Sequence, residues 1–81
     1  MNKHILFLID HLANPGKYTQ AELLANRRSA AAAAWGRTDN RAYRAYRAAR
    51  SAGNAAYWVD QYFKITDEDK QTYIDKLKGE S

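Results

Sequence analysis

Apolar residues between positions 42 and 63 recur at alternating steps of three and four, the spacing of one face of a long helix. This spacing predicts a helix from about residue 39 to 63. Gly53 and Asn54 fall in its middle, where we expect either a kink or a very close contact with a neighbouring helix. Most of the seam is alanine, whose small side chain lets two helix axes approach closely. The seam consists of Ala42, Ala45, Ala49, Ala52, Ala56, Val59 and Phe63.

Start and stop signals predict two helices before this one. Asn2 is a suitable cap for a helix over residues 3–13, and the sequence Asn-Pro-Gly at 14–16 ends it. Thr19 and Glu22 have the spacing of a capping box. They predict a second helix from residue 20 through the alanine tract to Trp35, closed by Gly36.

Further caps complete the pattern. Thr38 or Asp39 can cap the long helix. Thr66 and the three acids that follow it predict a fourth helix, which ends near Gly79. No stretch alternates polar and apolar residues as a strand would, so the chain is predicted to be all-α.

The expected architecture follows from the alanine seam. The helix over 20–35 offers Leu24, Ala31 and Ala34 as partners for it, which favours a close antiparallel pair. We therefore predict a small three- to four-helix bundle built on a long antiparallel helical hairpin, with residues 1–81 forming a single helical domain.

The aromatic residues exceed what so small a bundle can bury. Fifteen of the 81 residues are alanine, which buries little area, so the core of a monomer is thin. The predicted long helix also extends beyond its partner over residues 20–36. We therefore expect a two-fold dimer. Its interface residues are Ala56, Tyr57, Trp58, Tyr62 and Phe63.

Charge is distributed unevenly along the chain. The net charge is +4, yet all seven arginines lie between residues 27 and 50, where Asp39 is the one acid. Arginine differs from lysine in offering a planar fork to carboxylates and phosphates and in stacking on aromatic rings. The segment from 41 to 50 interleaves arginine with tyrosine, both frequent at binding hot spots. The predicted partner-binding residues are Arg41, Tyr43, Arg44, Tyr46, Arg47 and Arg50.

This segment is open to three interpretations. It can bind a protein with an acidic surface, or it can bind nucleic acid, with arginine on phosphate and tyrosine stacked on bases. It can also be structural, with tyrosines in the core and arginine stems packed around them. We favour the protein partner, because no known DNA-reading motif is present.

Catalytic and metal-binding constellations are not evident. The chain has no cysteine, and His4 and His11 lack further ligands at helical spacing. The glycines are scattered singly, and no serine has a nearby His/Asp pattern. We therefore expect neither an enzyme nor a cofactor or metal. The five-residue apolar run from Ile5 to Ile9 is too short for a membrane span or a signal peptide, so a soluble cytoplasmic protein is predicted.

Three features occur together in this chain: residues 14–23, the tract from Ala30 to Trp35, and tyrosines and arginines interspersed among alanines. In these features the chain resembles small alanine-rich helical accessory proteins of tailed bacteriophages. The resemblance covers roughly residues 2–63. It implies a non-enzymatic protein made during infection, in the class that includes inhibitors of host restriction and other defence systems, acting in the host cytoplasm. Many inhibitors of DNA-binding enzymes are acidic DNA mimics, whereas this chain is basic. The resemblance therefore implies docking on an acidic host protein, or action at nucleic acid.

Overall fold

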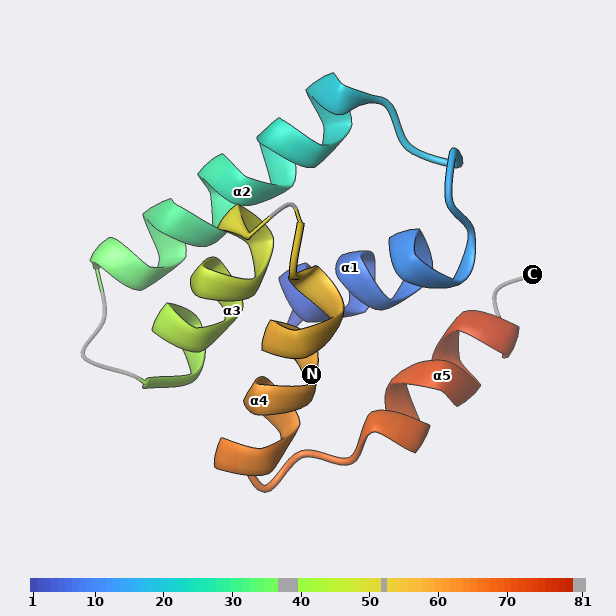
Figure 1. The fold of residues 1–81 in the computed structure, drawn as a ribbon. Helices are drawn as coiled ribbons and strands as arrows, with labels where there is room; N and C mark the ends of the chain where they lie inside the picture. Colours follow the sequence, from blue (N-terminus) through green and yellow to red (C-terminus); the bar gives the residue numbers. More distant parts are fainter. Residues whose placement is uncertain (37–39, 52, 80–81) are drawn as a thin grey trace.

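The computed structural model describes residues 1–36, 40–51 and 53–79, which form five helices and no strand (Figure 1). This confirms the all-α prediction. The helices are α1 (Lys3–Ala13), α2 (Gln20–Trp35), α3 (Asn40–Arg50), α4 (Ala55–Ile65) and α5 (Lys70–Gly79).

The predicted caps of the first two helices are confirmed. The Asn2 side chain accepts hydrogen bonds from the backbone N–H groups of His4 and Ile5 at the start of α1. At the start of α2, Thr19 and Glu22 each accept a bond from the other's backbone N–H, which completes the capping box. Gly36 follows the last residue of α2 as predicted. The candidate caps Thr38 and Asp39 lie outside the described residues.

The predicted long helix over 39–63 is wrong, because the chain turns between α3 and α4. The Ser51 hydroxyl donates to the carbonyl oxygen of Arg47 at 2.9 Å, and the Asn54 N–H donates to the Ser51 carbonyl at 3.0 Å. These bonds end α3 and lead into α4, which packs back against α3. Of the two alternatives for Gly53, the structure shows a break in the helix and not a close contact, since an added Cβ there would meet nothing within 4 Å.

The turn also changes which residues of the seam are buried. Ala42 and Ala45 are buried as predicted, and Ala48 joins them. In α4 the buried side chains are Ala55, Val59 and Tyr62, whereas Ala56 is exposed and Phe63 is half-buried. The seam residues would all lie on one face only if residues 42–63 formed one continuous helix.

The last helix begins later than predicted. Thr66 ends α4 instead of starting α5, because its hydroxyl donates to the carbonyl oxygen of Tyr62 at 2.8 Å. Asp69 accepts a bond from the Gln71 N–H at 3.0 Å in the first turn of α5. The helix dipole accounts for Asp69, but Glu68 has a different role, described below.

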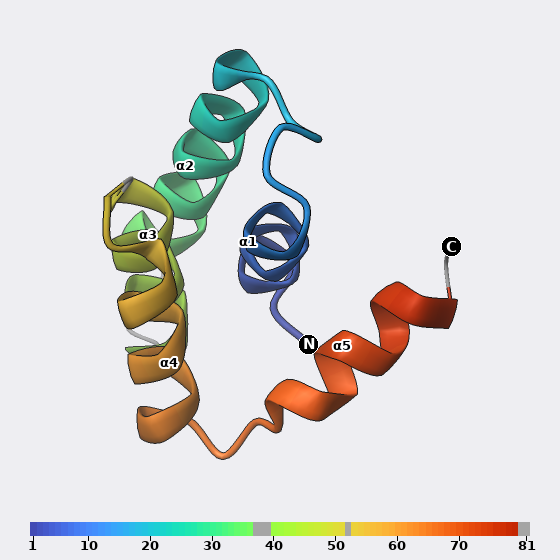
Figure 2. The same ribbon diagram turned by 45° about the vertical axis from the view of Figure 1, so that its right-hand side comes forward.

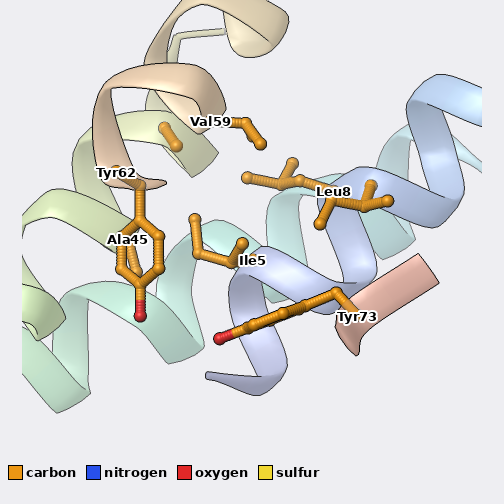
Figure 3. Packing of buried hydrophobic residues seen from close by; sticks show 8 residues of the cluster. Ile5, Leu8, Ala45, Val59, Tyr62 and Tyr73 are labelled. Atoms are coloured by element: carbon orange, nitrogen blue, oxygen red, sulfur yellow. The ribbon is translucent and has the colours of Figure 1, made fainter. Parts of the chain in front are cut away.

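The core surrounds α1. Figure 2 shows α1 between the group formed by α2, α3 and α4 and the outlying α5. In both ribbon views α2 and α3 run side by side in opposite directions, but α3 ends at Arg50, so the long hairpin expected from a helix over 39–63 is not formed. Side chains from α1, α3, α4 and α5 meet in one cluster (Figure 3). Its buried members are Ile5, Leu8, Ile9, Ala45, Ala48, Val59, Tyr62 and Tyr73.

Candidate protein-interaction surface

Helical spacing turns most of the α3 polar residues away from the core. Since Ala42, Ala45 and Ala48 are buried, the opposite side of α3 presents Tyr43 and Arg50 to solvent. Tyr43 is 49% exposed. Burying small alanines on one face thus places the large polar and aromatic side chains on the other.

The turn at 51–54 brings α4 aromatic residues beside the α3 arginines. The Arg47 guanidinium lies over the Trp58 ring, 4.3 Å from its centroid. Tyr57 meets Trp58 edge-on, with ring centroids 5.0 Å apart. Arg50 lies over the Tyr46 ring at 6.0 Å. We call these six residues the arginine–aromatic surface: Tyr43, Tyr46, Arg47, Arg50, Tyr57 and Trp58.

The remaining predicted arginines are placed differently. Arg41 approaches Glu68, with Nε 4.0 Å from Oε2, so it belongs to the end of the bundle near the α4–α5 connection. Arg44 is half-buried on α3. Within the part of the chain that the structure describes, Arg44, Arg47 and Arg50 form no salt bridge.

The structure divides the predicted dimer residues. Ala56 and Tyr57 are exposed, and Tyr57 retains 56% of its surface. Trp58 and Phe63 are half-buried, and Phe63 packs edge-on against Tyr73 at 5.1 Å. Tyr62 is fully buried inside the chain, so its assignment to a dimer interface is wrong.

Tyr62 is buried because Glu68 satisfies its hydroxyl. The Tyr62 hydroxyl donates to Glu68 Oε2 at 2.6 Å, and the Tyr73 hydroxyl donates to Glu68 Oε1. Figure 3 shows the two phenol groups directed toward the same side of the cluster. The Tyr73 oxygen also accepts the Asn2 backbone N–H at 2.7 Å, so this network links the N-terminus, α4 and α5. Burial, and then the bond to Glu68, raises the pKa of both tyrosines above the ordinary value.

A second polar cluster ties the segment after α1 to that helix. The buried carboxylate of Asp10 accepts bonds from Asn14, Lys17 and Tyr18, with Lys17 Nζ at 2.6 Å. These bonds, led by the one from Lys17, lower the pKa of Asp10. Phe7 packs against the Tyr18 ring at 4.2 Å. The connection between α1 and α2 is thereby folded against α1.

The two histidines occupy different environments. His4 is buried, and its Nε2 lies 2.9 Å from the Ser29 hydroxyl oxygen. Burial, together with the charge of Lys3, lowers the pKa of His4. His11 is half-buried at the other end of α1. Among the residues that the structure describes, no three His, Asp or Glu side chains gather in a way that could hold a metal.

Three features of the fold are not predicted by the sequence pattern. Asp10 and Glu68 are ordinary helix acids by pattern, and their partners are visible only once the chain is folded. Trp35 is 93% exposed at the end of α2, and its exposure is not predicted by the helical pattern. The position of Trp35 at the end of its helix, directly before Gly36, was the signal in the sequence that could have indicated this exposure.

Two global observations complete the description. None of the described helices has the length and apolar character needed to cross a membrane. The chain matches no protein-family model, and neither a curated protein nor a solved structure is significantly similar to it.

Proposed function

We propose that this chain is a non-enzymatic binding protein that docks its arginine–aromatic surface on an acidic patch of a partner protein and blocks that partner. Following the phage resemblance, the partner is a host protein, such as a component of a defence system, in the host cytoplasm. The Arg47–Trp58 stack is the observation that carries the proposal.

A stacked guanidinium is well suited to bind carboxylates. Stacking occupies the flat face of the Arg47 group and leaves its in-plane N–H donors available for bidentate bonds to Asp or Glu. The ring also restricts the side chain before binding, which lowers the entropy lost on association. Tyr43 and Tyr57 provide exposed aromatic area beside it, and such residues supply much of the energy of protein interfaces.

Nucleic-acid binding is the alternative, and the surface supports it less well. Single-strand binders need open aromatic faces on which bases can stack. Of the four rings in the surface, Trp58 lies under Arg47 and Tyr46 under Arg50, which leaves Tyr43 and Tyr57 open for stacking. The positive charge is common to both alternatives and makes both sensitive to salt, so direct binding to nucleic acid is the discriminating measurement.

We further propose that the chain forms a homodimer through the exposed part of α4. Ala56 is exposed and lines, with Leu12, a pocket of about 390 Å³ between α1, α4 and α5. The lining is mainly apolar but includes the Asp60–Lys70 ion pair. Tyr57 follows Ala56 directly in α4 and is 56% exposed, although its side chain does not line this pocket. Trp58 and Phe63 would contribute only their exposed edges.

The test is capture of a partner from host cells with tagged chain, followed by reconstitution from purified proteins. The α3 variant Arg47→Gln/Arg50→Gln removes both arginine charges from the arginine–aromatic surface. Arg28→Gln/Lys64→Gln removes two charges from exposed positions outside the surface. We expect the wild type and the control to retain the partner and block its activity, and the α3 variant to lose both.

Full activity of the α3 variant would contradict the proposal. A gel shift at ~50 mM salt tests the alternative. If duplex or single strands are retarded, if this binding weakens steeply as salt rises, and if the α3 variant loses it, the partner is nucleic acid and not a protein.

A further inference from the structure

A pocket of about 280 Å³ opens where α1, α2, α3 and α4 converge. Its apolar wall contains side chains from all four helices. Leu24 is 41% exposed, which leaves a large apolar side chain of α2 uncovered at this position. The apolar lining residues are Leu8, Leu23, Leu24, Ala49 and Ala55.

The polar part of the same lining is basic. Arg27 from α2 and Arg50 from α3 both line the pocket, and neither forms a salt bridge with a described residue. Gln20 and His11 complete the lining, and no Asp or Glu is among the nine residues around the pocket. Two arginines that border a mainly apolar wall, with no acid in the lining, favour an anion that carries an apolar body.

We propose that this pocket binds a small amphiphilic monocarboxylate, with its carboxylate between Arg27 and Arg50 and its apolar tail along the leucine wall. The volume sets the size of the ligand. It equals about nine water molecules at ~30 Å³ each, which accommodates a straight-chain or aromatic acid of about ten non-hydrogen atoms. An amine of the same length is repelled by the arginines, and an alcohol gains only the apolar contact.

This site is separate from the proposed partner-binding function, although Arg50 belongs to both. Arg27 lies on α2, outside the arginine–aromatic surface. A variant at Arg27 therefore tests the pocket without removing a side chain from that surface.

The experiment is titration of the full ¹⁵N-labelled chain with octanoate, octanol and octylammonium, followed by amide chemical shifts. We expect octanoate to shift amides around the pocket and to bind more tightly than octanol by about tenfold. Octylammonium should cause no such shifts. Arg27→Gln should weaken octanoate binding by about tenfold, whereas Arg28→Gln, with the same charge change, should leave it within about twofold.

A second pair of variants tests the apolar wall. Leu24→Glu places a carboxylate beside the arginines and should abolish octanoate binding, while Ala25→Glu, exposed on α2 outside this pocket, should preserve it. Helix content measured by circular dichroism confirms that each variant is folded.

Equal binding of octanol and octanoate, equal effects of Arg27→Gln and Arg28→Gln, or no shift at the pocket would each overturn the proposal. If Arg27→Gln still captures the partner but no longer binds octanoate, the pocket is independent of the proposed partner-binding function.

Discussion

At the scale of single residues, two carboxylates hold parts of the chain that neighbouring helices alone would leave loose: the buried Asp10 and the half-buried Glu68. Glu68 accepts hydroxyl groups from α4 and α5, and Asp10 accepts three donors from the segment that leads into α2. Charge-assisted hydrogen bonds of this kind are stronger than neutral ones, and leaving one partner unpaired in the interior is costly.

Replacing Asp10 tests the first cluster. We expect Asp10→Asn to lower the free energy of unfolding by about 2 kcal/mol at pH 7, because an amide cannot accept all three donors as a carboxylate does. The pKa of Asp10 lies below its ordinary value of 3.8 in the fold, so its contribution is complete above about pH 4 and is lost as the pH falls through the folded pKa. Urea unfolding of both proteins should therefore show a difference at pH 7 that disappears in strong acid.

The exposed acid Asp67 provides the control for this prediction. Asp67→Asn should leave the unfolding free energy within about 0.5 kcal/mol of wild type. A pH-independent difference between the wild type and Asp10→Asn would show that the carboxylate charge is not what stabilises this loop.

The Glu68 network makes a second residue-scale prediction. Tyr62→Phe and Glu68→Gln should each destabilise the fold, and the double variant should lose less than the sum of the two single losses. A double-mutant cycle measured by urea unfolding should give a coupling of about 1 kcal/mol. Strict additivity would mean that the hydroxyl and the carboxylate act independently.

At the scale of elements, the turn between α3 and α4 determines where the arginine–aromatic surface forms. In one continuous helix, Arg47 and Trp58 would be separated by about 16 Å along the axis, at 1.5 Å per residue. The turn instead places the Trp58 ring beneath the Arg47 guanidinium. The same turn points Val59 and Tyr62 into the core around α1.

The open space around Gly53 predicts how this turn responds to substitution. Gly53→Ala should leave the unfolding free energy unchanged or raise it by up to about 1 kcal/mol, because a Cβ fits and the unfolded chain loses freedom. Gly16→Ala is the matched comparison, since Gly16 has a φ of 92° and alanine is strained there. That variant should be destabilised by about 1 kcal/mol. Thermal unfolding of both proteins distinguishes the two effects, and a marked loss at Gly53 would reveal a contact there after all.

At the scale of the whole molecule, the proposed dimer depends on how much aromatic surface the monomer covers by itself. Tyr62 is buried and Phe63 packs against the core, so the monomer accommodates more aromatic area than the alanine content suggests. Tyr57 and Ala56 remain uncovered. The interface available to a second copy is therefore smaller than the one expected from the long helix.

Ala56→Glu tests that interface. Because Ala56 is exposed, we expect the variant to keep its helix content while the dimer dissociates through repulsion between the paired carboxylates. Light scattering at ~100 μM provides the measurement, with Lys64→Glu as an exposed α4 control. A wild-type mass that stays at 9.3 kDa would exclude the dimer. Outright unfolding of Ala56→Glu would instead place residue 56 in the monomer core.

The sequence by itself determined the helices that start with local signals. The Asn2 cap and the Thr19–Glu22 capping box act between residues two or three positions apart, so they can be inferred without knowledge of the fold. The alanine spacing likewise predicted that Ala42 and Ala45 are buried, because side-chain periodicity is a property of one helix.

Only the tertiary structure decided the features that join distant residues. The seam from 42 to 63 fits a single helix, but packing around α1 requires α4 to turn back, and this global requirement outweighs the local pattern. The Tyr73 hydroxyl meets the backbone of Asn2 across 71 positions. The side-chain partners of Glu68 are the Tyr62 and Tyr73 hydroxyls, which the fold brings to it. The pairing of Arg47 with Trp58 and the pocket between Arg27 and Arg50 arise in the same way. Each depends on how two helices pack against each other, and the spacing of residues within one helix does not determine that packing.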